Sequence, residues 1–87
     1  MTAKLIAVTD PATGLPIGTT AVFLTLGSAL VALFQASEPA PAGGSGFRWI
    51  CLGCLDHSTY PDPRQTARNN ANTHAAECRA IPLPTAA

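Results

Sequence analysis

Two pairs of residues with metal-binding side chains dominate the second half of the sequence. Cys51 and Cys54 form a Cys-x2-Cys pair, and His74 and Cys78 form a His-x3-Cys pair. From residue 47 onward large apolar side chains are few, so apolar burial alone cannot stabilise this part of the chain. It needs a metal ion or disulfides, and a disulfide framework would leave one of the 3 cysteines unpaired.

Local sequence signals predict a helix over residues 63–79, PRQTARNNANTHAAECR. Asp62 is a good N-cap, Pro63 suits the first helical position, and Gln65 completes a D-x-x-Q pattern that resembles a capping box. Pro82 is expected to stop the helix shortly after residue 79.

The predicted helix places His74 and Cys78 on one face, because residues four positions apart lie one turn apart. Ala67 and Ala71 continue this face, and their small side chains would let the helix lie close to the Cys-x2-Cys turn. Gly53 fits a tight turn between the two cysteines. The pattern predicts a knuckle, a loop and a helix around one metal ion.

The number and type of these side chains favour one Zn²⁺ ion, which prefers four nitrogen or sulfur ligands in a tetrahedron. The predicted ligands are Cys51, Cys54, His74 and Cys78. Four protein ligands leave no open position for a catalytic water, so we expect a structural metal and no enzymatic activity. His57 is the alternative to His74 as the fourth ligand.

This pattern resembles the C2HC type of zinc finger over residues 47–81. The resemblance implies that the same two cysteines, histidine and third cysteine bind the metal. The interval between Cys54 and His74 is longer than the about 12 residues of the common C2H2 pattern, so the standard ββα docking geometry does not follow from it.

The Cys51–Cys54 pair considered alone has other interpretations. A thioredoxin-like redox couple would place the pair at a helix N-terminus within a βαβ fold, for which this module is too short. In an exported protein a disulfide could join Cys51 to Cys54, or one of them to Cys78. Haem attachment would need histidine where the chain has Leu55. Phe47 and Trp49 are expected to pack over the metal site, and a stacking platform for bases is the alternative.

The first half of the chain carries a long uncharged stretch, from Pro11 to Ser37. About 20 apolar residues in a helix span the ~30 Å hydrocarbon layer of a membrane, so residues 17–36 are predicted to form one transmembrane helix. A buried core helix and a signal peptide cleaved at Ala40-Pro41-Ala42 are the alternatives. Small residues at four-residue spacing would allow two such helices to associate, namely Thr25 with Ala29 and Ser28 with Ala32.

These predictions give a small mixed α+β protein with one transmembrane helix, followed by a zinc-stapled module of a knuckle and a helix. Its expected parts are an N-terminal segment with a short hairpin around Asp10–Gly14, the membrane helix, a flexible linker, the zinc-binding module and a tail, at residues 1–16, 17–36, 37–46, 47–82 and 83–87. The bias of Lys and Arg towards the C-terminal side places the zinc module in the cytoplasm of a single-pass membrane protein.

Three arginines on the predicted helix fall on one side of it: Arg64, Arg68 and Arg79. They could contact phosphate in DNA, RNA or lipid headgroups, although a net charge of +0 gives no global attraction to nucleic acid. An ordinary solvated helix face is the alternative.

Three functions are compatible with this pattern. The first is a membrane-tethered zinc finger that binds a protein partner, and the second is a membrane-associated nucleic-acid-binding finger. The third is an exported redox or disulfide protein. The style of ARNNANTHAAECRAIP resembles small proteins of actinobacterial plasmids and phages, such as the conjugative-plasmid spread proteins, which implies a role in DNA transfer for the second.

Overall fold

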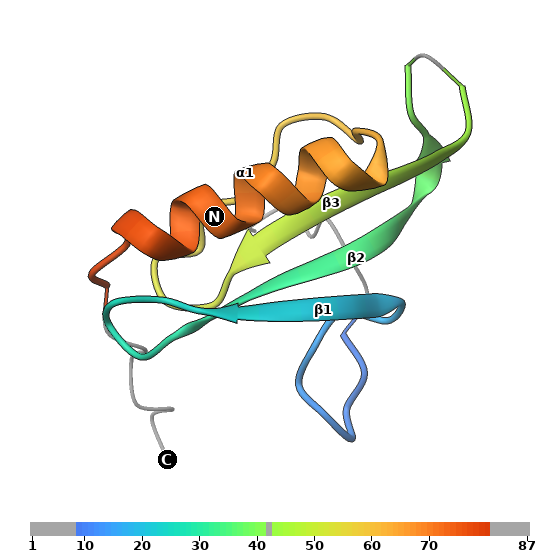
Figure 1. Cartoon of the computed structure of the whole chain (residues 1–87). Coiled ribbons are helices and arrows are strands. Elements are labelled where there is room, and N and C mark those ends of the chain that lie inside the picture. Colours follow the sequence, from blue (N-terminus) through green and yellow to red (C-terminus); the bar gives the residue numbers. More distant parts are fainter. Residues whose placement is uncertain (1–8, 42, 81–87) are drawn as a thin grey trace, which may run out of the picture.

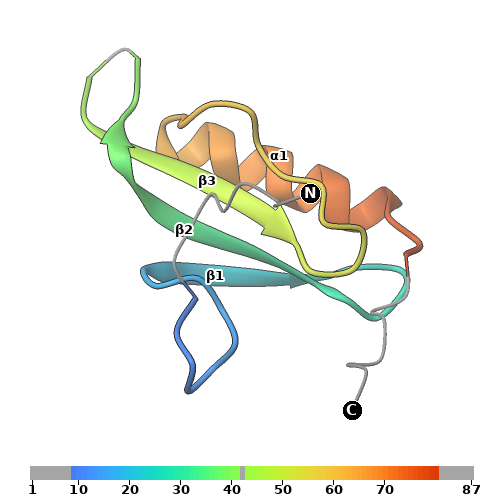
Figure 2. The ribbon, with the colours of Figure 1, turned by 180° about the vertical axis from the view of Figure 1, so that it is seen from behind.

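The computed structural model describes residues 9–41 and 43–80, which form an antiparallel sheet with a helix on one face. The elements in chain order are β1 (Thr19–Leu24), β2 (Leu30–Pro39), β3 (Ser45–Cys51) and α1 (Arg64–Glu77). The 3 strands lie in the order β1-β2-β3, so each is hydrogen-bonded to its neighbour in the sequence. Figure 1 shows α1 lying across the sheet, and the reverse view in Figure 2 shows the strands in front of the helix.

β1 forms because its sequence, TTAVFL, is rich in β-branched and aromatic side chains that alternate between two environments. Ala21 and Phe23 pack towards the helix, against the buried residues of β2, β3 and α1. Val22 and Leu24 alternate with them, point to the other side of the sheet, and are exposed.

A tight turn joins β1 to β2. The Thr25 N–H donates to the carbonyl of Ala29 (2.9 Å), and the Ala29 N–H donates to the Thr25 hydroxyl oxygen (2.9 Å). Ser28 adopts a left-handed conformation with φ 66°, and Gly27 provides room for the backbone of Ala80 to lie against the turn. The turn therefore reverses the chain in the middle of its most apolar stretch.

β2 is the central strand, and its first half, residues 31–34, is buried on both faces. Val31 and Leu33 belong to the clusters under α1, and the alternating residues Ala32 and Phe34 are also buried. A central strand with both faces buried is a nearly continuous apolar run, which composition alone cannot distinguish from a buried helix.

The transmembrane helix predicted over residues 17–36 is wrong. These residues form β1, its turn and most of β2, and within residues 9–41 and 43–80 no helix combines the length and apolar character that a membrane span requires. The single-pass membrane location and oligomerisation through that helix are corrected with it. β-branched residues in β1 and the turn at Gly27-Ser28 favour a hairpin over a helix.

The predicted linker, residues 37–46, instead contains the end of β2, a turn and the start of β3. In the turn, Gly43 and Gly44 have positive φ, and the Ala40 N–H donates to the Gly44 carbonyl (3.1 Å). The two halves of the sequence are therefore strands of one sheet. The fold is a small antiparallel sheet plus one helix, not a membrane helix joined to a separate module.

The turn predicted at Asp10–Gly14 is present. The N–H groups of Thr13 and Gly14 donate to the Asp10 carbonyl, and Gly14 has φ 73°. Thr9 pairs with Pro16 across this loop. Residues 1–8 of the predicted N-terminal segment, and the tail at 83–87, lie outside the described residues.

After β3 the chain turns at the Cys-x2-Cys knuckle and runs back along the strand before α1 begins. This return segment, residues 55–62, pairs with β3 through bridges from Ile50 to His57 and from Phe47 to Asp62. The Arg48 guanidinium fixes it by donating to the carbonyl of Ser58 (3.0 Å). The chain thus runs back beside β3 as a loop that leads directly into the helix (Figures 1 and 2).

α1 begins without the predicted cap. Pro63 is the N-cap residue and no side chain caps the helix, because the backbone of Asp62 exchanges two hydrogen bonds with Phe47 of β3 instead. Gln65 bonds to Asn69 rather than completing a capping box. Long-range pairing with the sheet therefore sets the start of the helix.

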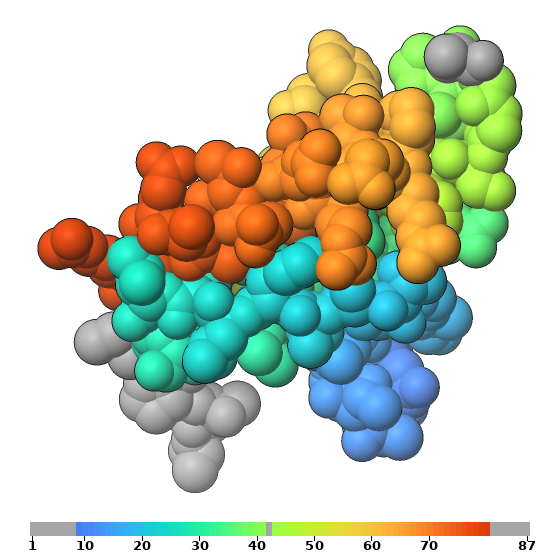
Figure 3. Space-filling model, in the orientation of Figure 1, coloured from blue at the N-terminus to red at the C-terminus, as the bar shows by residue number. Residues whose placement is uncertain are grey.

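The side chains that α1 buries completely against the sheet are small, and the partly buried His74 beside them contacts Trp49. The buried residues of α1 are Ala67, Ala71 and Ala75, which lie at four-residue spacing and pack on Val31, Leu33 and the aromatic side chains of β3. Small side chains let the helix backbone lie close to the strands. The exposed side of α1 is polar and forms one surface with β1 and its turn (Figure 3).

We predict that Gly27→Ala destabilises the protein by about 1–3 kcal/mol. A Cβ at position 27 would collide with the backbone carbonyl of Ala80, which cannot move aside as a flexible side chain can. Urea unfolding measures the change. In the same turn, Ser28→Gly should be neutral or stabilising by up to about 1 kcal/mol, because it removes a left-handed serine. Equal effects of the two substitutions would contradict this account of the turn.

Candidate metal centre

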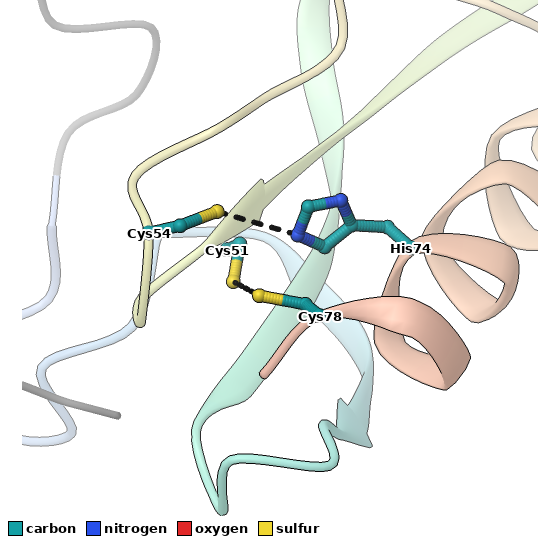
Figure 4. Close-up of side chains that lie close together, drawn as sticks. All are labelled: Cys51, Cys54, His74 and Cys78. Carbon is teal, nitrogen blue, oxygen red and sulfur yellow. Dashed lines mark hydrogen bonds between the residues drawn. The ribbon is translucent and has the colours of Figure 1, made fainter. Parts of the chain in front are cut away.

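The four predicted ligand residues lie together where the knuckle meets the C-terminal end of α1. Cys51 is the last residue of β3, Cys54 follows in the knuckle, His74 lies on α1 and Cys78 lies directly after it. One ligand atom from each residue falls within 4.8 Å of the others. Figure 4 shows the four side chains pointing towards one another from these two parts of the chain.

Two of the separations between ligand atoms match the edges of a tetrahedral metal site, and all of them lie within 4.8 Å. Zn–S bonds of ~2.3 Å and Zn–N bonds of ~2.0–2.1 Å imply tetrahedron edges of about 3.8 Å between two sulfurs and about 3.6 Å between sulfur and nitrogen. The Cys51 and Cys78 sulfurs are 3.9 Å apart, and the Cys54 sulfur lies 3.4 Å from His74 Nε2. These residues could therefore bind one metal ion.

All three cysteines are free thiols that differ in exposure. Cys51 is buried, Cys78 is intermediate and Cys54 is exposed. The site thus has an inner side, formed by the end of the sheet, and an outer side at the knuckle.

The knuckle is held by backbone hydrogen bonds. The Leu55 N–H donates to the Cys51 carbonyl (2.9 Å), and the Asp56 N–H donates to the Cys54 sulfur (3.4 Å). Leu55 has φ 67°, an unusual conformation for leucine, which the tightness of the turn imposes. Gly53 is required because a Cβ there would press against Ala29 of the β1–β2 turn and against Ala80.

His74 is oriented by contacts on several sides. Its ring lies against the Trp49 ring, with centroids 4.9 Å apart. Its Nε2 faces the Cys54 sulfur, and its Nδ1 lies 3.8 Å from a carboxylate oxygen of Asp56. Cys78 is not a helical residue but the C-cap, in an extended conformation, and its N–H donates to the His74 carbonyl (2.8 Å). The end of the helix therefore positions both ligands.

His57, the alternative ligand, is not part of the cluster. Its side chain is on the exposed return segment, where Nδ1 lies 2.8 Å from the carbonyl of Ser58. Of the two histidines, only His74 shares the site with the three cysteines.

The aromatic residues expected over the site divide between two places. Trp49 contacts His74, as predicted, whereas Phe47 packs with Leu33 and Ala67 further along the sheet. Phe47 therefore belongs to the core between α1 and the sheet, away from the cysteines.

The three arginines lie outside the metal centre. Arg64 and Arg68 are exposed on α1, and Arg68 is placed over the Phe23 ring, 5.4 Å from its centroid. Arg79 follows the extended Cys78, so it does not continue the helical stripe predicted for it. Phosphate contact by these residues stays a prediction.

Asp56 was not among the predicted site residues, although it contacts the site. An acidic side chain two positions after the second cysteine of a Cys-x2-Cys pair is the only sign in the sequence, and it does not reveal that His74 folds back beside it.

The environment separates the pKa values of the two knuckle thiols. Burial raises the pKa of Cys51, but the N–H groups of Cys54 and Gly53 and the His74 side chain stabilise its thiolate and bring the pKa down to about 7, from 9.0. Burial and the neighbouring cysteines raise the pKa of Cys54 to about 11. Of the two knuckle thiols, the buried Cys51 therefore ionises first, and the thiolate is the form that binds a metal.

Comparison of the chain with protein families, curated proteins and solved structures found no match. The interpretation of the site therefore depends on its geometry and chemistry.

We predict opposite effects of the two thiols on the stability of the metal-free protein. Cys51 has a lowered pKa, so its contribution is present above pH 9 and is lost as the pH falls from about 9 to about 7. Cys54 has a raised pKa, so its contribution is present below pH 9 and is lost between about 9 and about 11.

Urea unfolding of the metal-free protein at pH 7, 9 and 11 measures both effects. Cys51→Ser should abolish the rise in unfolding free energy between pH 7 and 9 and reduce the fall above pH 9, because Cys51 is one of the neighbours that raise the pKa of Cys54. A rise that persists in this variant would show that another group causes it.

Proposed function

We propose that this chain is a small domain that one structural Zn²⁺ ion holds together, and that it serves as a protein-interaction module. The observation that supports metal binding is the convergence of three sulfurs and one imidazole nitrogen at tetrahedral spacing. Three thiolates and one imidazole are ligands typical of structural zinc.

A structural role follows from the number of ligands. Four protein side chains complete a tetrahedron, so bound zinc would keep no position for a water or a substrate. The ion would instead join the end of β3 to the end of α1, whose buried side chains are alanines. Metal binding in such a site contributes directly to folding free energy.

Exposed apolar side chains on and beside β1 support an interaction role. Leu24 and Leu26 are 69% and 62% exposed, and Ile17 and Val22 are also exposed. Val22 and Leu24 lie on the face of the sheet that α1 does not cover. Exposed apolar side chains, of which Val22 and Leu24 share one face of β1, are a feature of protein contact sites.

The described geometry does not favour nucleic-acid binding or an exported redox protein. Arg68 already contacts Phe23, and Arg79 lies beyond the helix, so the described geometry gives no continuous basic stripe. Cleavage at residues 40–42, which the exported form would need, would remove β1 and β2 and with them the central strand of the sheet.

We predict that the protein binds one zinc ion per chain, as elemental analysis of the purified protein would measure. Cys78→Ser should lower the zinc affinity by more than about 100-fold, because losing a ligand exceeds the 10–100-fold effect of losing an outer partner. Titration of the metal-free protein with Co²⁺ gives a second measurement, since Trp49 contacts His74 and its fluorescence should change as the ion binds.

His57→Ala is the matched control, because it removes an exposed histidine outside the cluster. It should keep the zinc stoichiometry and affinity, whereas His74→Ala should lose them. Wild-type protein that binds no zinc, or a His57→Ala variant that loses it, would refute the proposed ligand set.

We predict that replacing Leu24 and Leu26 by Asn weakens binding to a partner protein recovered from the source cells. Leu55→Asn is the control, because Leu55 is equally exposed (67%) but lies in the knuckle. Affinity purification followed by binding measurements with the recovered partner would test this. A partner that binds all three proteins equally would contradict a contact site on β1.

A further inference from the structure

We infer that Asp56 is a positioning residue of the metal centre, whose carboxylate holds the His74 ring with Nε2 towards the three sulfurs. The inference rests on the proposed zinc site and adds to it a residue that is not a ligand. Its basis is a set of contacts that joins Asp56 to three of the four ligand residues.

The backbone of Asp56 fixes its place beside the site. Its carbonyl accepts a hydrogen bond from the Cys51 N–H (2.8 Å), and its N–H donates to the Cys54 sulfur (3.4 Å). The position of the Asp56 Cα is therefore set by the same knuckle that presents the two cysteines.

The side chain of Asp56 is then directed towards the helix. One carboxylate oxygen, Oδ1, accepts a hydrogen bond from the N–H of His57 (3.0 Å). The other, Oδ2, lies 3.8 Å from Nδ1 of His74. This separation is too long for a direct hydrogen bond, and an ion pair would form only with a protonated imidazole, but it places the carboxylate of the knuckle beside Nδ1 on α1.

The two ring nitrogens of His74 face different partners. Nε2 lies 3.4 Å from the Cys54 sulfur, and Nδ1 faces Asp56. A neutral imidazole carries one proton, so Nε2 can give its lone pair to a metal only when the proton is on Nδ1. A carboxylate beside Nδ1 favours that tautomer, and a bound cation at Nε2 strengthens its attraction for the Nδ1 proton.

Trp49 and Asp56 act on the ring in different ways. The Trp49 ring contacts the imidazole at 4.9 Å between centroids and limits its tilt. It cannot distinguish the two nitrogens, because an aromatic ring offers neither a hydrogen-bond acceptor in the imidazole plane nor a full charge. Asp56 distinguishes the two nitrogens, because its carboxylate lies beside Nδ1.

Zinc competition titrations test the inference. Asp56→Ala should lower the zinc affinity by about 10–100-fold, the effect typical of losing an outer partner of a ligand histidine. Asp56→Asn should give an intermediate affinity, because the amide oxygen still accepts a hydrogen bond but carries no charge. The absorption spectrum of the Co²⁺-loaded variants should keep the wild-type form, since the four ligands are unchanged.

Asp10→Ala is the matched control. Asp10 is also a loop aspartate whose carboxylate accepts a backbone hydrogen bond, from the Ala12 N–H (2.9 Å), but it is not in the metal cluster. This variant should bind zinc as the wild type does. An NMR signal of the His74 Nδ1–H proton, slow to exchange in the zinc-loaded wild type and broadened in Asp56→Ala, would identify the atom on which Asp56 acts.

The outcomes separate this inference from the proposed function. Wild-type protein that binds no zinc would refute both. Zinc binding by the wild type with Asp56→Ala and Asp56→Asn within twofold of it would overturn the inference alone. Where Asp56→Ala fails to fold, the comparison of Asp56→Asn with Asp10→Asn decides: weaker binding by the first only supports the role, and equal binding overturns it.

Discussion

The fold depends on how the knuckle and the end of α1 are joined, because the helix itself buries little apolar surface against the sheet. Its buried residues are Ala67, Ala71 and Ala75, and each alanine removes far less apolar area from water than a leucine would. Small side chains allow a close approach but little stabilisation. Three sulfurs and an imidazole at the end of β3 and of α1 lie where a metal ion would supply the missing attachment. The helix thus lacks large apolar residues but carries potential metal ligands at its end, and a bound metal would compensate for the weak apolar packing.

The local part of this arrangement could be predicted from the sequence. Residues four positions apart lie about one helical turn apart, and this holds closely enough for His74 and the C-cap residue Cys78 that they could be paired with the knuckle without knowledge of the sheet. The preference for His74 over His57 followed from the same periodicity, and the cluster contains His74. The start of the helix could not be predicted in this way. Asp62 has a side chain typical of an N-cap, but its backbone is hydrogen-bonded to Phe47 of β3. Such pairing between distant residues cannot be recognised from the local sequence.

The first half of the chain shows the limit of composition more clearly. A strand buried on both faces needs apolar side chains at every position, as Val31–Phe34 have, and a membrane helix needs the same. What separates them is the alternation in β1 and the turn around Gly27 and Ser28, each only a few residues long. The average composition of the uncharged stretch shows neither the alternation in β1 nor the turn. The contact of Asp56 with His74 could not be predicted for another reason, since it exists only after the chain has folded back.

The position of β2 at the centre of the sheet has a consequence during synthesis on the ribosome. β1 and β2 emerge before α1, and those of their apolar side chains that pack under α1, such as Val31 and Leu33, lack this cover until residues 64–80 follow. An uncovered apolar hairpin of this kind favours association with other nascent chains or capture by a chaperone. The segment that covers this hairpin is also the one that carries His74 and Cys78. Metal binding would therefore complete the fold at the stage when the nascent chain is most prone to aggregate, so a shortage of metal in the cell would prolong that stage.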